Sequence, residues 1–444
     1  MSKSSIKVLI DLNHKLKKLD TQKYELDLLR SDTYFTRKPK KLSFIDDMKL
    51  IMSMGSSSLK EEMYKYFGYN LDTVSAPGFV ESRVKIKDTA FKHLMDMMNK
   101  TYPCKKTYKG YRLLAVDGSD ITISTDENDL LTSHHNQNEK GYNNLHLNGL
   151  FDILNHRYLD AIIQGVRNEN EKLAMIDLAK NYKGDKAIFI ADRGYEAYNI
   201  FENIRNTGNY FLIRVRNVES SHSICRRFKS LPNKKEFDEE VEITFTNKHT
   251  NEIKSQSEKY ISIMSNQNFD YLDKDNHFYD AKYRFVRIKI DGKDEEYETL
   301  ITNLPKDEFS NEDIKELYKL RWNIEVSYKH LKYSVNLNAL HSKRRDFIKQ
   351  EIWARLVMFN VSMIIIDDIQ ENKVKKNERN KYEYKICISK AIHLICGSIV
   401  KRKGGVPPDL IELIAKEILP IRPGRSSIRN VKTHSFVGFN YRFC

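Results

Sequence analysis

A chain of 444 residues is too long for one compact core, so the length predicts two to four domains. Lysine and arginine outnumber aspartate and glutamate by 75 to 61; the net charge of +14 favours a polyanionic partner but also fits an ordinary basic protein. The five cysteines lack paired spacing, and no segment has the length and apolarity of a secretion signal or membrane span. These features argue against a disulfide framework, a zinc finger and a membrane protein. They predict a cytoplasmic protein.

The first hundred residues have a helical pattern. Ser58 and Glu61 have capping-box spacing, and the helix that they begin is expected to end near Gly68. A further helix is predicted from Pro77 through Leu94. Short helices in a basic context fit a helix-turn-helix-like DNA reader, and an ordinary three-helix packing unit fits equally well.

From residue 111 onward, short apolar strands alternate with helices. The predicted elements are a strand 113–116 that stops at Asp117 and resumes at 121–123, a hairpin that turns at 155–156, a helix 171–182, a strand 187–191 that ends at Asp192, a helix 198–207 and a strand 210–214. This order predicts an α/β layered core with mixed strand directions.

The rest of the chain divides by its pattern and charge. Residues 217–303 read as strands separated by polar loops, and a helical pattern follows to about residue 369. The basic surplus lies mainly in residues 1–41 and beyond 369, which would suit clamping a duplex by sequence-independent phosphate contacts. We expect five regions: a helical DNA-binding domain 1–105, the first part of the core 106–216, a β-rich insertion 217–303, the second part of the core 304–370 and a basic helical region 371–444.

Asp117 and Asp192 have the same sequence context. Each follows a short apolar strand and precedes a glycine-containing turn. Ligands bind at the carboxyl ends of strands in α/β sheets, and two carboxylates brought together there favour a divalent cation between them. Oxygen ligands suit Mg²⁺ or Mn²⁺. Either aspartate alone is more typical of a turn or helix cap.

A third carboxylate lies on a predicted helix from Ile314 to Val335. Tyr318, Arg321, Glu325, Lys329 and Lys332 occupy directions within about 80° of one another on this helix, beside an apolar stripe that would pack on the sheet. The functional interpretation makes Glu325 a metal ligand flanked by phosphate-binding side chains. The alternative is a solvated face with ion pairs such as Glu325 to Lys329.

These residues resemble a known family. The spacing Tyr318-x2-Arg321-x3-Glu325-x6-Lys332 fits the Y-(2)-R-(3)-E-(6)-K signature of insertion-sequence transposases of the IS-four family. Asp117-Gly118-Ser119 and the run from Ile190 to Tyr195 are similar to its two aspartate motifs, and the β-rich stretch resembles its insertion. The resemblance covers about residues 44–343.

The resemblance implies a ribonuclease-H-like core and a DDE triad of Asp117, Asp192 and Glu325 that holds two Mg²⁺ ions, with Mn²⁺ as a substitute. It implies cleavage at inverted-repeat element ends, joining of the 3′-hydroxyl to target DNA, and a homodimer that pairs two ends. Such an enzyme would work at the prokaryotic nucleoid. Tyr318, Arg321, Lys329 and Lys332 would contact the DNA backbone, and Trp322 would stack on an unpaired base or else pack within the protein.

Several neighbouring residues and functions stay open. Asp120 is a candidate accessory ligand, and His146, His330 and His341 are candidate phosphate contacts. A structure-selective endonuclease would use the same fold, metals and triad without strand transfer. A transposase-derived DNA-binding protein without catalysis is the third candidate, and the presence of all three carboxylates argues against it.

Overall fold

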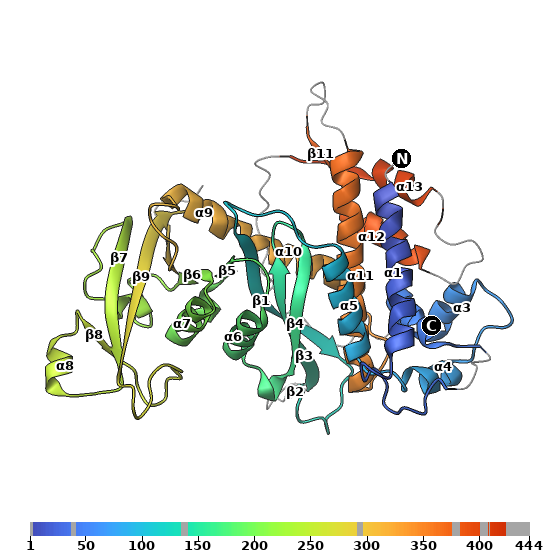
Figure 1. Ribbon diagram of the computed structural model, residues 1–444, viewed down its shortest axis with the longest axis horizontal. Coiled ribbons are helices and arrows are strands. Elements are labelled where there is room, and N and C mark those ends of the chain that lie inside the picture. Colours follow the sequence, from blue (N-terminus) through green and yellow to red (C-terminus); the bar gives the residue numbers. More distant parts are fainter. Residues whose placement is uncertain are drawn as a thin grey trace.

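The computed structural model describes residues 3–36, 41–134, 141–290, 296–374, 382–399, 407 and 409–422 (Figure 1). The helices are Lys3–Gln22 (α1), Phe44–Ser53 (α2), Leu59–Phe67 (α3), Ala76–Arg83 (α4), Thr89–Thr101 (α5), Glu171–Asn181 (α6), Tyr198–Asn206 (α7), Asn251–Ser255 (α8), Asn311–Leu320 (α9), Trp322–Tyr333 (α10), Arg345–Asn372 (α11), Ile388–Ser398 (α12) and Leu410–Lys416 (α13). Much of the predicted region 371–444 lies outside the described residues. No helix within the described ranges is long and apolar enough to cross a membrane.

The strands are Arg112–Ile123 (β1), Ser133–His134 (β2), Tyr142–Asp152 (β3), Arg157–Gly165 (β4), Ala187–Ala191 (β5), Tyr210–Val215 (β6), Phe237–Thr246 (β7), Tyr260–Ser262 (β8), Phe278–Lys289 (β9), Tyr297–Thr302 (β10), Tyr384–Ile386 (β11) and Ile418–Pro420 (β12). Ten of them form one sheet in the order β2-β3-β1-β5-β6-β10-β9-β7-β8, with β4 paired to β3. β1, β5 and β6 run parallel to one another, whereas β3 and β10 pair antiparallel to β1 and β6. The predicted mixed α/β architecture is confirmed.

The strands predicted as an insertion continue this same sheet. β10 pairs directly with β6, and β9 and β7 follow outward, so the hydrogen-bonded ladder runs without interruption from the core into this region. In Figure 1 these strands and α8 form the left end of the molecule. β10 thus connects β9 to β6, which pairs with β5, the strand before Asp192.

Alternation along the central strands creates two apolar layers. Leu113 and Ala115 of β1 face one core, together with residues of α9, α10 and α11. Leu114 and Val116 face the other core, which contains residues of α6 and α7. Successive side chains of a strand point to opposite faces, so each residue number on β1 fixes the layer that its side chain enters.

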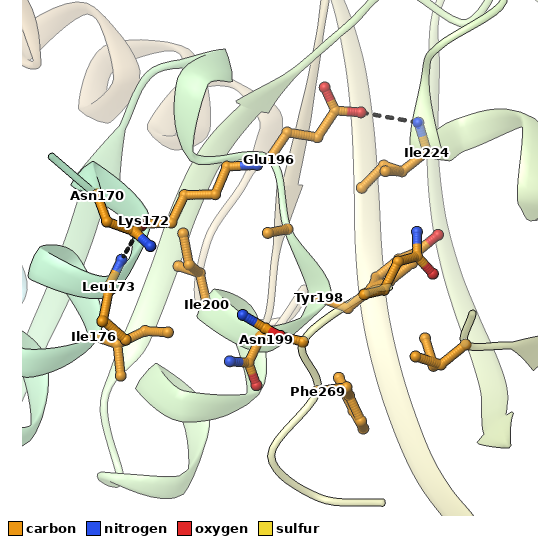
Figure 2. A pocket seen from close by; sticks show the side chains of 14 residues that line it. Asn170, Lys172, Leu173, Ile176, Glu196, Tyr198, Asn199, Ile200, Ile224 and Phe269 are labelled. Carbon is orange, nitrogen blue, oxygen red and sulfur yellow. Dashed lines mark hydrogen bonds between the residues drawn. The ribbon is translucent and has the colours of Figure 1, made fainter. Parts of the chain in front are cut away.

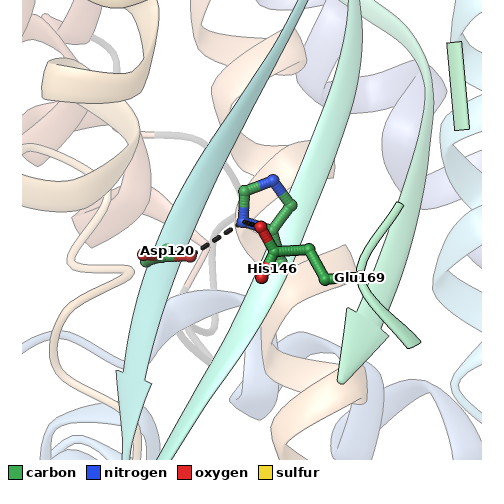
Figure 3. Close-up of side chains that lie close together, drawn as sticks. All are labelled: Asp120, His146 and Glu169. Atoms are coloured by element: carbon green, nitrogen blue, oxygen red, sulfur yellow. Dashed lines mark hydrogen bonds and ion pairs between the residues drawn. The ribbon is translucent and has the colours of Figure 1, made fainter. Parts of the chain in front are cut away.

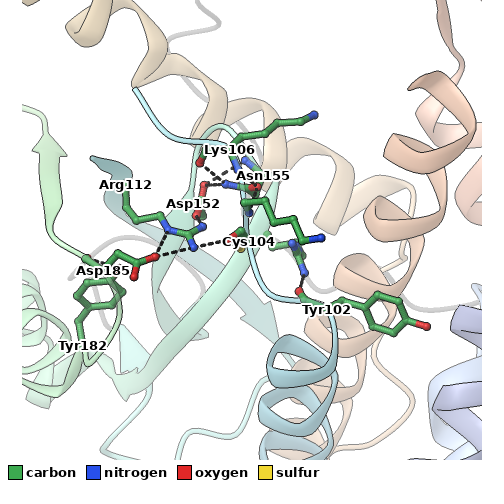
Figure 4. Close-up of polar contacts among 10 residues, drawn as sticks. Tyr102, Cys104, Lys106, Arg112, Asp152, Asn155, Tyr182 and Asp185 are labelled. Atoms are coloured by element: carbon green, nitrogen blue, oxygen red, sulfur yellow. Dashed lines mark hydrogen bonds and ion pairs between the residues drawn. The ribbon is translucent and has the colours of Figure 1, made fainter. Parts of the chain in front are cut away.

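A polar cluster fixes the beginning of β1 (Figure 4). The Arg112 guanidinium lies 3.3 Å from an Asp152 oxygen and 2.9 Å from an Asp185 oxygen. Asn155 donates to Asp152 over 2.8 Å, and its own side-chain oxygen accepts from the amides of Lys105 and Lys106. Because Asp152 is buried, this pairing is stronger than a surface ion pair and holds β1 against β3 and the segment before β5.

The N-terminal helices pack on α11, which stands beside α1 and α5 (Figure 1). Ser58 and Gly68 cap α3 as predicted, Gly68 with a left-handed φ of 70°. The single helix predicted from Pro77 to Leu94 is wrong: α4 ends at Arg83 and α5 begins at Thr89. The intervening residues pair with an earlier segment instead, through the β-bridge Leu29↔Ile86, and a local periodicity cannot reveal that partner.

Candidate functional site

Asp117 lies within a strand rather than at its end. The predicted stop at Asp117 is wrong, because β1 continues to Ile123 and residues Asp117 to Ile123 pair antiparallel with β3. Its parallel pairing with β5 ends earlier, at Ala115↔Ile190. Asp117 therefore stands where the neighbouring strand stops, which exposes one flank of β1 at this position.

Asp192 follows β5 directly, as predicted, and a 3₁₀ turn from Arg193 to Tyr195 comes next. Counted from the pair Ala115↔Ile190, Asp117 and Asp192 each lie two residues further along their parallel strands. They are level, and both belong to the set of residues that faces α9 and α10. This register is consistent with the expectation that neighbouring strands bring the two aspartates to one edge of the sheet.

Glu325 and Arg321 come from a helix that is broken. The predicted continuous helix 314–335 is wrong: α9 ends at Leu320, α10 begins at Trp322, and tighter i−3 bonds on either side of Arg321 mark the junction. Arg321 is 8% exposed, and its guanidinium lies 3.0 Å from Glu325. The alternative pairing of Glu325 with Lys329 is not the one that forms.

Arg321 connects the carboxylates electrostatically. Its charge acts on Asp192 as well as on Glu325, and the Tyr318 hydroxyl donates to Asp192 over 3.3 Å. Burial raises the pKa of Asp117 to about 6; the Gly118 amide and Arg321 oppose the increase, and Glu325 adds to it. A carboxyl group with a raised pKa beside other charged groups, as at Asp117, is typical of a functional site.

The other predicted DNA-binding residues lie along α10. Trp322 is 50% exposed, with its ring centroid 5.2 Å from the Arg321 guanidinium carbon, and Lys329 is exposed. Lys332 is partly buried near Asp120, and burial lowers the pKa of its ammonium group. Tyr318 is buried. Trp322 and Lys329 are therefore exposed, whereas Arg321 and the α9 residue Tyr318 are turned toward the sheet.

Two further charged residues at this edge were missed by the sequence analysis. Glu298 of β10 lies 3.9 Å from Arg214 of β6, and burial raises the pKa of its carboxyl group. Both are on the layer of Leu300 and Leu212, which faces α9 and α10. β10 is antiparallel to β6, so its first residues reach the edge where β5 ends. The proximity of Glu298 and Arg214 follows from the register of β10, and no local sequence motif predicts it.

A cleft beside Asp192 gathers positive charge. It has a volume of about 650 Å³ and is lined by Asp192, Arg193, Arg214, Arg216 and residues near them. Three guanidinium groups around one open concavity suit phosphate oxygens, which arginine binds in a planar, two-pronged geometry.

A second cavity, of about 280 Å³, lies between α6, α7 and residues of the predicted insertion that lie outside its strands (Figure 2). Its floor is apolar and includes Ile176, Ile200 and Phe269. The Glu196 carboxylate accepts a hydrogen bond of 2.8 Å from the Ile224 amide, which orients it away from the cavity floor. This cavity holds no set of carboxylates comparable with the edge near Asp117.

Among the described residues, the set of three whose candidate ligand atoms all lie within 4.8 Å of one another is Asp120, His146 and Glu169, so the triad carboxylates stand farther apart. Asp120 turns to His146 over 2.8 Å instead of joining Asp117. Burial lowers the pKa of His146, but hydrogen bonds to Asp120 and Glu171 outweigh it and raise the value to about 10. The predicted phosphate contacts at His146 and His341 are wrong, because both side chains are buried against carboxylates.

Comparison with known proteins gives a family for this geometry. Residues 108–361, more than half of the chain, match the family described as transposase DDE domain. The chain belongs to this family. The match begins just before β1 and ends within α11, so it includes both aspartates and Glu325.

Curated transposases of insertion sequences align with shorter segments of the chain. The chain is 41% identical over 70 residues to the putative transposase InsL of insertion sequence element IS186A and to the transposase of IS421, both from Escherichia coli, which covers 16% of this chain and 18% of each relative. It is 28% identical over 123 residues to the putative transposase of IS4SA from Synechocystis, which covers 26% of this chain and 36% of that relative. A piggyBac transposase synaptic complex with hairpin DNA aligns with a TM-score of 0.42 and 9% identity, over 95% of this chain and 86% of that one.

Proposed function

We propose that this protein is a DNA transposase of the IS-four type. It binds the inverted-repeat ends of an insertion sequence, cleaves the DNA by phosphodiester hydrolysis and joins the 3′-hydroxyl ends to target DNA. The observation that carries the proposal is the level position of Asp117 and Asp192 on parallel strands, with Arg321 linking Asp192 to Glu325. Membership of the transposase DDE domain family supports it.

The three carboxylates fit a site for two Mg²⁺ or Mn²⁺ ions within a ribonuclease-H-like core. Their donor atoms are all oxygens, the ligands that these cations prefer. Asp117 is partly buried, which raises its pKa, and Glu325 and Glu171 raise it further, so the ion-free site carries an unfavourable concentration of negative charge. When bound, such a pair of ions activates the attacking oxygen and stabilises the leaving oxygen of an in-line displacement.

The chain's own residues position the DNA. Arg321 and Tyr318 face the sheet edge, where they would hold the backbone near Asp192, while Lys329 and Lys332 would bind phosphates further along α10. Trp322 is exposed at the start of α10 and would stack on an unpaired base. The arginine cleft beside Asp192 would accept another stretch of backbone. A homodimer would hold two element ends together.

The test uses the full chain, Mg²⁺ or Mn²⁺, labelled DNA carrying the inverted repeats that flank its coding region, and a target plasmid. Asp117→Asn, Asp192→Asn and Glu325→Gln should each abolish nicking and joining, by a factor of at least about 10³, and leave end binding within about threefold. Asp177→Asn, an exposed carboxylate on α6, should behave as wild type.

The alternatives give different results in the same assay. Cleavage without joining would indicate the endonuclease, and binding without any metal-dependent nicking would indicate the DNA-binding protein. Cleavage that survives in all three variants would refute the assigned triad.

A further inference from the structure

A second group of metal-ligating side chains lies outside the triad. Asp120 of β1, His146 of β3, Glu169 at the end of the turn after β4, and Glu171 at the start of α6 form what we call the histidine cluster (Figure 3 shows its first three members). The antiparallel register pairs Asp120 directly with His146. Nothing in the proposed reaction uses these residues.

The histidine cluster and the triad occupy opposite faces of the sheet. A Cβ atom added at Gly118 would lie 2.2 Å from the His146 Nε2 and 2.4 Å from a Glu171 oxygen, so both side chains lie on the face to which residue 118 points. Asp117 precedes Gly118 in the same strand, and its side chain therefore points to the other face. A ligand of the histidine cluster would be a separate one.

The atoms around Nδ1 of His146 have the spacing of a coordination sphere. An Asp120 oxygen lies 2.8 Å and a Glu169 oxygen 3.6 Å from this nitrogen, and all three atoms are within 4.8 Å of one another. With metal–ligand bonds of about 2.1 Å, neighbouring ligand atoms stand roughly 3.0–3.4 Å apart. Small side-chain rotations would suffice to admit an ion.

A carboxylate lies beside the other ring nitrogen. Nε2 of His146 lies 2.9 Å from Glu171, and the ring is only 5% exposed. Histidines that bind metals almost always give their second N–H to a carboxylate or carbonyl, which fixes the ring and the tautomer. Gly118 makes this contact possible, because no side chain could be accommodated there.

Charge also favours a cation. Asp120, Glu169 and Glu171 surround one imidazole, so the negative charge exceeds the positive even when the ring is protonated. Lys332 also acts on Asp120 through its charge.

We propose that the histidine cluster binds one divalent cation of the Mn²⁺ or Zn²⁺ type through His146 Nδ1, Asp120 and Glu169. A mixed nitrogen and oxygen set favours these ions over Mg²⁺. The bound ion fastens the start of α6 to β1 and β3 three residues beyond Asp117. Its role is structural, and it goes beyond the proposed transposase activity.

The test separates this site from the triad. The full-length protein carrying Asp117→Asn, Asp192→Asn and Glu325→Gln is stripped of metal and titrated at neutral pH with Mn²⁺, followed by electron paramagnetic resonance, and with Zn²⁺, followed by calorimetry. One ion should bind per chain and raise the thermal midpoint. Adding Asp120→Asn or Glu169→Gln should weaken binding by more than about tenfold, and Glu171→Gln by roughly 10–100-fold.

Glu127→Gln, which changes an exposed carboxylate in the loop after β1, should leave the affinity unchanged. Metal-free circular dichroism of each variant shows whether it folds. The proposal would be overturned if the protein with the three triad substitutions bound neither Mn²⁺ nor Zn²⁺. It would also be overturned if adding Asp120→Asn left the affinity for the ion unchanged. The readout contains no DNA, so failure of the transposase assignment leaves this result unaffected.

Discussion

At the scale of single residues, Arg321 is the cation that allows acidic groups to gather without a metal ion. It is nearly buried at the break between α9 and α10, and its positive charge acts on Asp192 and Glu325 together. Removing a partner from such a group leaves a partly buried charge uncompensated, which costs more than the pairing contributes.

We expect Arg321→Gln to lower the free energy of unfolding of the metal-free protein by about 1–3 kcal/mol. Mg²⁺ or Mn²⁺ should then stabilise the variant more than it stabilises the wild type, because the ion takes over the missing charge. Urea unfolding with and without the ion measures both effects. Lys329→Gln, an exposed position on α10, should change stability by less than about 0.5 kcal/mol. An equal response of Arg321→Gln and wild type to the ion would contradict this role.

Asp47 gives a residue-scale prediction on pH. It is fully buried in α2 and accepts a hydrogen bond from Ser82 over 2.5 Å, and burial raises its pKa from 3.8 to about 7. Between these values the folded protein holds a proton that the unfolded chain releases, so this residue makes stability fall as pH rises, by at most about 1.4 kcal/mol per unit. Asp47→Asn should remove that contribution.

The comparison is made by urea unfolding of wild type and Asp47→Asn across the interval from pH 4 to pH 7. The stability of the variant relative to wild type should increase steadily with pH. Parallel profiles would show that Asp47 does not titrate in this range.

At the scale of elements, one tyrosine fixes the glutamate helix to the strand that carries the first aspartate. The Tyr328 hydroxyl donates to the carbonyl oxygen of Asp117 over 2.8 Å and lies 3.1 Å from that of Leu147. α10 is thereby held against β1 and β3 one turn after Glu325, so the separation of Glu325 and Asp117 depends on this contact.

Tyr328→Phe should therefore impair cleavage more than DNA binding. It leaves two buried carbonyl oxygens without their shared donor, at a cost of about 1–2 kcal/mol in stability. We expect single-turnover nicking to slow by about 10–100-fold, since small displacements of reacting groups have large effects on rate. Tyr333→Phe, on the same helix but 67% exposed, is the matched control. A variant that cleaves at the wild-type rate would show that the contact does not position Glu325.

The elements were predictable where their signals are local, and less so where partners are distant. β5, α6, α7 and the cap residues of α3 followed from apolar runs and capping chemistry. The interruption predicted at Asp117 failed because pairing with β3 overrides a run of turn-forming residues. The break at Arg321 was hidden because both halves continue the same helical periodicity.

The candidate site shows the same division. Asp117, Asp192 and Glu325 could be proposed from strand context and residue spacing, and their roles stay predictions. Glu298 and Glu171 could not, and His146 could be named only as a phosphate contact, since each becomes a neighbour through strand register or through the approach of α6. Sequence patterns identify residue types with suitable chemistry, whereas the register decides which of them meet.

At the scale of the whole molecule, α11 joins the N-terminal helices to the layers around the sheet. The Arg83 guanidinium lies 3.1 Å from Glu351, and both side chains are buried. Gln350 donates to the carbonyl oxygens of Arg83 and Ile86. Burial raises the pKa of Glu351, but the hydrogen bond with His341 and the charge of Arg83 outweigh burial and hold this pKa well below its usual range. The N-terminal helices and α11 are thus coupled by charge as well as by apolar packing.

Arg83→Met should lower the free energy of unfolding by about 3–5 kcal/mol, because it leaves a buried carboxylate without its partner. Adding Glu351→Gln should cost less than the sum of the two single changes, since the pair is already broken. Urea unfolding of the three variants measures the coupling. Strictly additive effects would show that the two side chains do not stabilise each other.

The uninterrupted course of β1 has a mechanical consequence. Pairing with β3 continues before and after Asp117 and holds its backbone in the sheet, so Asp117 has little freedom to shift. Asp192 stands in a short turn and Glu325 on a side chain with several rotatable bonds, which makes them the adjustable members. When the site closes around a ligand, we therefore expect the carboxylates of Asp192 and Glu325 to move toward it, while β1 and Asp117 keep their positions.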